Sequence, residues 1–120
     1  MKRRTVLLCL ACLTWSAASC PAAAETRVQY FAVFVGGKKL GYLKHTRLAE
    51  AGKVTTTQEM VLTITRMNIS MKLRQTEQTV ESAAGRPLAF KSVQDFGIMA
   101  QTIEGTIGAD GQIEATIVAG

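Results

Sequence analysis

Cysteine is confined to one end of this 120-residue sequence, at positions 9, 12 and 20. If residues 1–24 are removed, the remainder can form no disulfide, no thiolate nucleophile and no cysteine-ligated metal site. Proline is scarce, with two residues in the whole chain, and the single tryptophan lies at position 15. After position 24, no hydrophobic run approaches the roughly 20 apolar residues of a membrane-spanning helix, so we predict that residues 25–120 are not transmembrane.

Residues 1–24 have the three parts of a secretory signal peptide. Basic residues at positions 2–4 form the positive n-region, residues 5–15 form an apolar h-region, and small residues precede Glu25. We therefore predict a signal helix, cleavage between Ala24 and Glu25, and an exported product that is periplasmic or secreted.

Two other fates of this segment are open. One is a retained N-terminal anchor. The other is a lipoprotein acylated at Cys20, which is disfavoured because Ala17 stands where a large aliphatic residue is usual and Pro21 follows the cysteine directly.

Cleavage also changes the charge of the protein. Three of the 14 basic residues leave with the signal peptide and all nine acidic residues stay, so the formal charge falls from +5 to +2. The remaining basic residues are dispersed and not interleaved with aromatics, which gives no indication of nucleic-acid binding.

Residues 25–120 predict one all-β domain after the N-terminal signal helix, an antiparallel meander of about seven strands. The arrangement could be a curled sheet, a half-barrel or a sandwich. The chain stops directly after a strand, which indicates a domain that is truncated at its C-terminus or a sheet that is incomplete. Turns are expected at Gly36-Gly37, at residues 51–53, at residues 85–87 and at Asp110-Gly111, where we expect type I′. The expected strands cover residues 27–35, 39–49, 54–65, 69–82, 88–96, 98–107 and 113–118.

The apolar pattern adds three finer expectations. Residues 27–35 carry apolar side chains on both faces of the expected strand, which predicts burial on both faces. Apolar positions are even before Arg66 and odd after it, so a tight turn is expected at residues 66–68, with a bulge as the alternative. The polar segment 75–81 is expected to project past the core or to face water on both sides.

Catalytic groups are sparse. His45 is the one histidine, and no orienting partner or set of metal ligands can be identified for it. The carboxylates are scattered over strands and turns, which does not favour an acid–base pair. We therefore predict no catalytic residue, no cofactor and no metal site, and hence no enzyme activity in this chain.

Methionine offers a different kind of surface. Met60, Met67, Met71 and Met99 could fill a core, form an adaptable apolar groove or, least favoured, bind a soft metal. The groove hypothesis predicts an apolar ligand or partner surface that consists of Tyr30, Phe34, Met60, Leu62, Met71 and Phe90.

Two stretches resemble a known family. They are YFAVFVGGKKLGYLKHTR at residues 30–47 and TITRMNISMKLRQTEQTVESAAGRPLAFKSVQD at residues 63–95. Together they are similar to the N-terminal β-rich region of exported bacterial transglutaminase-like proteins, which carries a G-x-K-x-G-Y hairpin and a G-[KR]-P-L turn. The opening is equally similar to exported β-rich proteins of unknown function.

The resemblance implies an accessory role. The family's activity resides in a downstream core with a Cys-His-Asp triad, and residues 25–120 contain no cysteine, so no catalytic residue is carried over. We expect a non-catalytic interaction region whose partner is a protein or a downstream catalytic domain. The alternative is a periplasmic carrier or binding module for a lipid or another apolar ligand.

Overall fold

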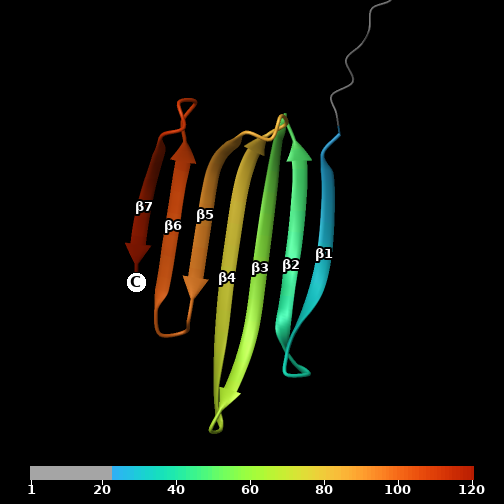
Figure 1. Ribbon diagram of the computed structural model, residues 1–120, viewed down its shortest axis with the longest axis vertical. Helices are drawn as coiled ribbons and strands as arrows, with labels where there is room; N and C mark the ends of the chain where they lie inside the picture. Colours follow the sequence, from blue (N-terminus) through green and yellow to red (C-terminus); the bar gives the residue numbers. More distant parts are fainter. Residues whose placement is uncertain (1–22) are drawn as a thin grey trace, which may run out of the picture.

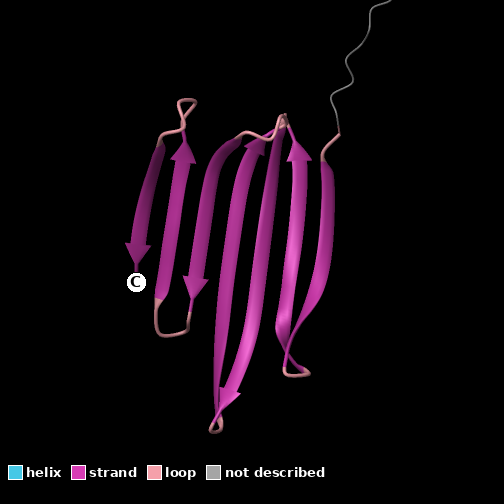
Figure 2. Cartoon of the chain, viewed as in Figure 1, coloured by secondary structure: helices cyan, strands magenta, loops and turns pink. Residues whose placement is uncertain are grey.

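The structure, a computed structural model, describes residues 23–120. These residues form seven β-strands and no helix (Figures 1 and 2). The expected signal helix and Cys20 lie outside the described residues. The strands are β1 (Glu25–Val35), β2 (Lys38–Glu50), β3 (Lys53–Arg66), β4 (Ile69–Ser82), β5 (Pro87–Asp95), β6 (Ala100–Ile107) and β7 (Ile113–Ala119).

Each strand lies antiparallel to the strand before it, so the spatial order is the chain order from β1 to β7 (Figure 1). Within residues 23–120 the strands form one open sheet, and the outer edges of β1 and β7 pair with no strand. The prediction of an all-β antiparallel meander of about seven strands is confirmed.

Three connections are two-residue hairpin turns, those between β1 and β2, β2 and β3, and β3 and β4. Both central residues of each turn have positive φ, as a type I′ turn requires. The predicted tight turn at residues 66–68 is confirmed, because β3 ends at Arg66, β4 begins at Ile69 and the two residues pair. The six turn residues are Gly36, Gly37, Ala51, Gly52, Met67 and Asn68.

The β6–β7 connection lies where the sequence places it but is not type I′. Of Asp110 and Gly111, only Gly111 has positive φ. The Gly108 N–H donates to the Gln112 carbonyl at 2.8 Å, and the Gly111 N–H donates to the Gly108 carbonyl at 3.1 Å. Asp110 Oδ1 accepts the Gln112 N–H at 3.1 Å. Asp110 therefore stabilises this loop as a side-chain acceptor.

A loop also replaces the expected start of the sixth strand at Ile98. Strand β6 begins at Ala100, and residues 96–99 connect it to β5. The Phe96 N–H donates to the Met99 carbonyl at 2.9 Å, and Asp95 Oδ1 accepts the Gly97 N–H at 2.8 Å. These two bonds define the loop.

The register assigns each side chain to one of two faces, because directly paired residues in neighbouring antiparallel strands point to the same face. We name the faces after two adjacent residues of β1. The row on the Phe31 face runs through Phe31, Leu43, Met60 and Gln75, and the row on the Tyr30 face runs through Tyr30, Lys44, Glu59 and Thr76.

Little of this sheet is buried. Within residues 23–120, Val61 is the one buried hydrophobic side chain, with 6% of its surface exposed. The expectation that residues 27–35 are buried on both faces is wrong, because Tyr30 is 67% exposed and Phe31 is 49% exposed. Strand β1 is an edge strand of a single layer, and no described element covers either of its faces.

The hairpin of β3 and β4 extends beyond its neighbours at one end of the sheet (Figure 1). Pairing of β2 with β3 stops at Leu62, and pairing of β4 with β5 stops at Arg74. Residues 63–73 therefore form a two-stranded projection. The polar segment 75–81 was expected to project past the core or to face water on both sides. It does not project, because it lies inside the sheet, where β5 pairs with it. The second alternative agrees with the structure, because the sheet is a single layer and none of these residues is buried.

Candidate interaction surfaces

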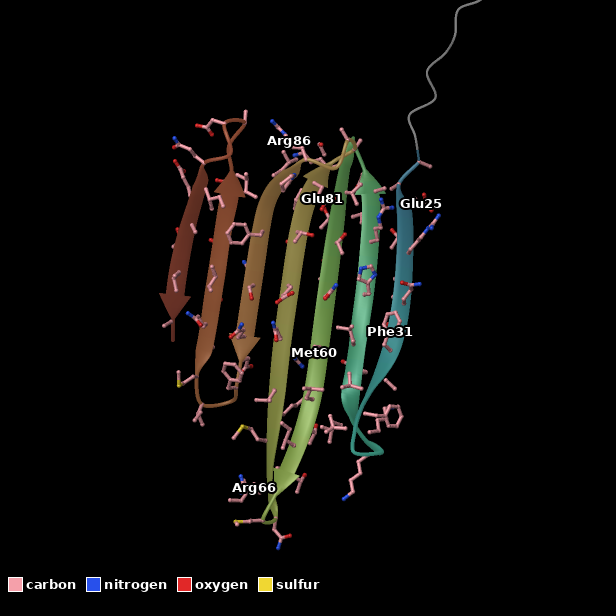
Figure 3. All side chains as sticks on the ribbon, in the orientation of Figure 1. Glu25, Phe31, Met60, Arg66, Glu81 and Arg86 are labelled. Atoms are coloured by element: carbon pink, nitrogen blue, oxygen red, sulfur yellow. The ribbon has the colours of Figure 1, made fainter. Side chains whose placement is uncertain are left out.

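An apolar patch occupies the Phe31 face near the projecting hairpin. The register aligns Val33, Leu62 and Leu73 in one row, with Gly41 between them, and Phe31, Leu43 and Met60 in the next. Strands β1 to β4 each contribute to it, and Figure 3 labels Phe31 and Met60. Full burial of one such side chain contributes about 1.5–3 kcal/mol, so covering this apolar patch would stabilise the domain substantially.

Gly41 allows β2 and β3 to come together at this patch. A Cβ on Gly41 would collide with the carbonyl group of Val61. The pairing of β1 with β2 shifts register between Val33 and Phe34, directly opposite this glycine. Glycine in a strand interior is typical of such a close backbone approach.

The six residues of the predicted apolar surface do not lie on one face. Met60, Leu62 and Met71 share the Phe31 face, whereas Tyr30 lies on the opposite one. Phe34 lies beyond the register shift, opposite Lys39 and next to the hairpin turn. The alternation of apolar residues predicted the faces within each strand, but not which face of β1 aligns with which face of β3.

Phe90, the sixth residue, lies on the Phe31 face but over a different part of the sheet. Its ring lies against Gly105 of the neighbouring strand β6, where an added Cβ would come within 2.6 Å of the ring's Cζ atom. An aromatic ring that covers a cross-strand glycine shields the exposed backbone of that strand. Phe90 therefore has a packing role within β5 and β6.

The Tyr30 face carries a shallow, solvent-open hollow of about 500 Å³. Lys44 Nζ lies 6.0 Å from the centroid of the Tyr30 ring, at the outer limit of a cation–π contact. The hollow is lined mainly by Tyr30, Ala32, Lys39, Tyr42, Lys44 and Glu59. Its mixture of rings and charges contrasts with the apolar patch on the other face.

Most of the carboxylates have local structural partners. Glu104 pairs with Lys91 at 3.2 Å, and Glu77 accepts a hydrogen bond from Gln75 at 2.7 Å. Asp95 and Asp110 each accept a backbone N–H in a loop. His45 lies between Gln29 and Gln58 in the register and makes none of the side-chain hydrogen bonds found within residues 23–120.

The methionines do not form one cluster. Met60 and Met71 share a face, but their register positions are four residues apart along the β3–β4 hairpin, about 13 Å. Met67 is 85% exposed at the hairpin tip and Met99 is 65% exposed in the β5–β6 loop, so these two fill no core. Among the described residues, no group of three or more His, Cys, Asp or Glu side chains could hold a metal ion.

Ile69 and Ile98, two of the most exposed apolar side chains beside the turns, were not among the predicted surface residues. Ile98 and Met99 directly follow Gly97, and Ile69 directly follows the Met67-Asn68 turn. Apolar residues beside a turn signal were the available clue. Their assignment to strands concealed it.

Residues 23–120 contain no helix, and therefore no helix that could span a membrane. Comparisons with protein-family models, curated proteins and solved structures found no match for this chain.

Proposed function

We propose that this chain is an exported, non-catalytic interaction region that acts as an accessory domain of a transglutaminase-like protein. The export part rests on the predicted signal peptide in residues 1–24, and the family part rests on the resemblance of residues 30–47 and 63–95. The interaction part rests on the apolar patch of the Phe31 face. A sheet normally buries its apolar face against a second layer, and residues 23–120 supply none.

The expected partner surface is the apolar layer of a catalytic domain. An apolar patch favours a protein interior or interface over a small polar substrate, because association gains free energy from the area removed from water. The partner's own reactive groups would carry out the chemistry. This chain would position that domain or present its substrate.

Site-specific photo-crosslinking in cells that express the protein tests this proposal. A photoreactive residue at Leu62, on the Phe31 face, should crosslink to a polypeptide that mass spectrometry identifies as carrying a Cys-His-Asp core. Thr63 is the matched control, because it is the next residue and points to the other face. Equal crosslinking at both positions, or none at Leu62, would contradict the proposal.

The alternative is a carrier for a lipid or another apolar ligand. The hollow beside Tyr30 and Tyr42 is the observation that favours it. Native mass spectrometry of protein from an envelope fraction distinguishes the two functions, since a carrier retains a ligand mass that a Tyr42→Ala variant loses.

A further inference from the structure

Three turns lie at one end of the sheet, because a meander alternates its connections between two ends, and the β3–β4 turn extends furthest (Figure 1). These are the β1–β2, β3–β4 and β5–β6 turns, at the lower end in Figure 3, where Arg66 is labelled. Each turn exposes large apolar side chains. The exposed set is Phe34 and Val35 in the first, Met67 and Ile69 in the second, and Phe96, Ile98 and Met99 in the third.

Hydrogen bonds stabilise two of these three turns. The hydroxyl groups of Thr65 and Ser70 bond across the β3–β4 hairpin at 2.8 Å. The β5–β6 loop is closed by its Phe96–Met99 backbone bond. Ile98 is 87% exposed and Ile69 is 70% exposed. The exposure is therefore built into well-formed turns.

The charges at this end are mainly positive. Asp95 is the one acidic residue at the three turns, and its side chain already accepts the Gly97 N–H. No acidic residue occurs in residues 60–76, which include the whole projecting hairpin. The basic residues are Lys38, Lys39, Arg66, Lys72 and Arg74. We call this region the basic end.

The other end of the sheet exposes fewer large apolar side chains. Its turns carry small or polar residues such as Ala51, Ala84 and Ala109, and Ile113, beside the β6–β7 loop, is a large apolar side chain that is 61% exposed. Figure 3 labels Glu25, Glu81 and Arg86 there. The acidic residues outnumber the basic ones, and we call this region the acidic end. Its acidic residues are Glu25, Glu50, Glu81, Asp110 and Glu114, and its basic residues are Arg27, Arg47, Lys53 and Arg86.

We propose that the basic end docks onto the surface of an anionic lipid bilayer. Met67 and Ile69 enter the interface, and Arg66 and Lys72 contact lipid phosphates. The hairpin extends four residues past Leu62, about 13 Å, while amphipathic elements enter the headgroup boundary by about 5–10 Å. Basic side chains beside apolar ones suit an anionic interface, because the basic groups are attracted to the lipid phosphates and the apolar groups are removed from water.

The backbone hydrogen bonds of the hairpin are compatible with this depth of insertion into the headgroup region. The paired strands of the hairpin satisfy each other's inward-facing N–H and C=O groups, and the headgroup region can hydrate those facing outward. Side chains enter the interface and no strand crosses it. This inference goes beyond the accessory role, since it concerns the end of the sheet and leaves the Phe31 face free for a protein partner.

Co-sedimentation of the exported product, purified from the cells that secrete it, with lipid vesicles tests the proposal. We expect binding to vesicles that contain phosphatidylglycerol in phosphatidylcholine, and weaker binding to pure phosphatidylcholine. Raising the salt concentration from about 0.1 M to about 0.5 M should weaken the binding to anionic vesicles, because it screens the exposed charges. The exported product lacks the basic and apolar segments of the predicted signal peptide, so the comparison between variants isolates the basic end.

The decisive variant is Met67→Asp/Ile69→Asp, with Ala84→Asp/Ala109→Asp as the matched control at the acidic end. The tip variant should lose at least about tenfold in partitioning onto anionic vesicles, since it replaces two apolar contacts with charges. The control should bind as the original chain does. A second pair compares Lys72→Glu, which should lose several-fold, with Lys53→Glu, which should lose little.

Thermal melts of each variant show whether it is folded. Vesicle binding by a folded tip variant at the original level, or equal losses in the two lysine variants, would overturn the proposal. So would equal binding to neutral and anionic vesicles. Because the crosslinking experiment probes the Phe31 face without vesicles, either proposal can fail while the other stands.

Discussion

Both ends of the sheet contain two-residue turns with positive φ, but the side chains in these turns differ. At the acidic end, Ala51-Gly52 forms a two-residue turn, with a small residue and a glycine at its positive φ positions. At the basic end, Met67-Asn68 forms the same kind of turn, with Met67 at a φ of 51°. A large side chain in this conformation costs about 1 kcal/mol. Ala51, at a φ of 50°, bears the same cost, so the two turns differ in the size of the exposed side chain and not in backbone strain.

The largest expected effect concerns two glycines, one near each end. Gly41→Val should lower the free energy of unfolding by about 3 kcal/mol, because its Cβ collides with the Val61 carbonyl and the strands must separate. Gly52→Val should lower it by about 1–2 kcal/mol through positive φ alone, since nothing lies within 4 Å of its added Cβ. Chemical denaturation of both variants measures the difference, and equal losses would contradict the collision at Gly41.

A smaller effect compares the two hairpin turns directly. Met67→Gly and Ala51→Gly should each raise the free energy of unfolding by about 1 kcal/mol, because glycine adopts positive φ without strain. Only Met67→Gly should also reduce partitioning onto anionic vesicles. Paired thermal melts and vesicle assays separate the two effects. A gain in stability without a loss of vesicle binding would place the membrane contact elsewhere.

The smallest effect compares two aspartates that cap loops at opposite ends. Asp95→Ala and Asp110→Ala each remove one hydrogen bond to a backbone N–H, and each should cost about 1 kcal/mol. Hydrogen exchange at Gly97 and Gln112 reports each loop. Unchanged exchange at both sites would show that these bonds contribute nothing.

Much of the fold follows from short-range signals in the sequence. Gly36-Gly37 indicated one hairpin, and the change in apolar parity around Arg66 predicted the Met67-Asn68 turn in a segment without glycine or proline. Both signals are local, since they depend on φ preference and on side-chain alternation within a few residues. The structure confirms both.

The errors arise where neighbouring strands decide the outcome. Residues 27–35 carry the apolar pattern of a fully buried strand, yet β1 lies at the edge of a single layer. Alternation within one strand does not tell how many layers cover it. Likewise, Tyr30 and Met60 were grouped by chemistry, but the pairing through Lys44 and Leu43 places them on opposite faces. At Asp110, side-chain bonding to Gln112 replaced the expected type I′ geometry.

The unbroken meander also has a consequence for how the chain acquires its structure. Because each strand pairs only with its sequence neighbours, no long loop must close before a contact forms, and the entropic barrier to each step stays low. The β3–β4 hairpin, whose pairing runs from Lys53 and Ser82 to Arg66 and Ile69, is the natural nucleus. We expect the remaining strands to pair onto this hairpin one after another on both sides, so that the sheet forms from its centre outward.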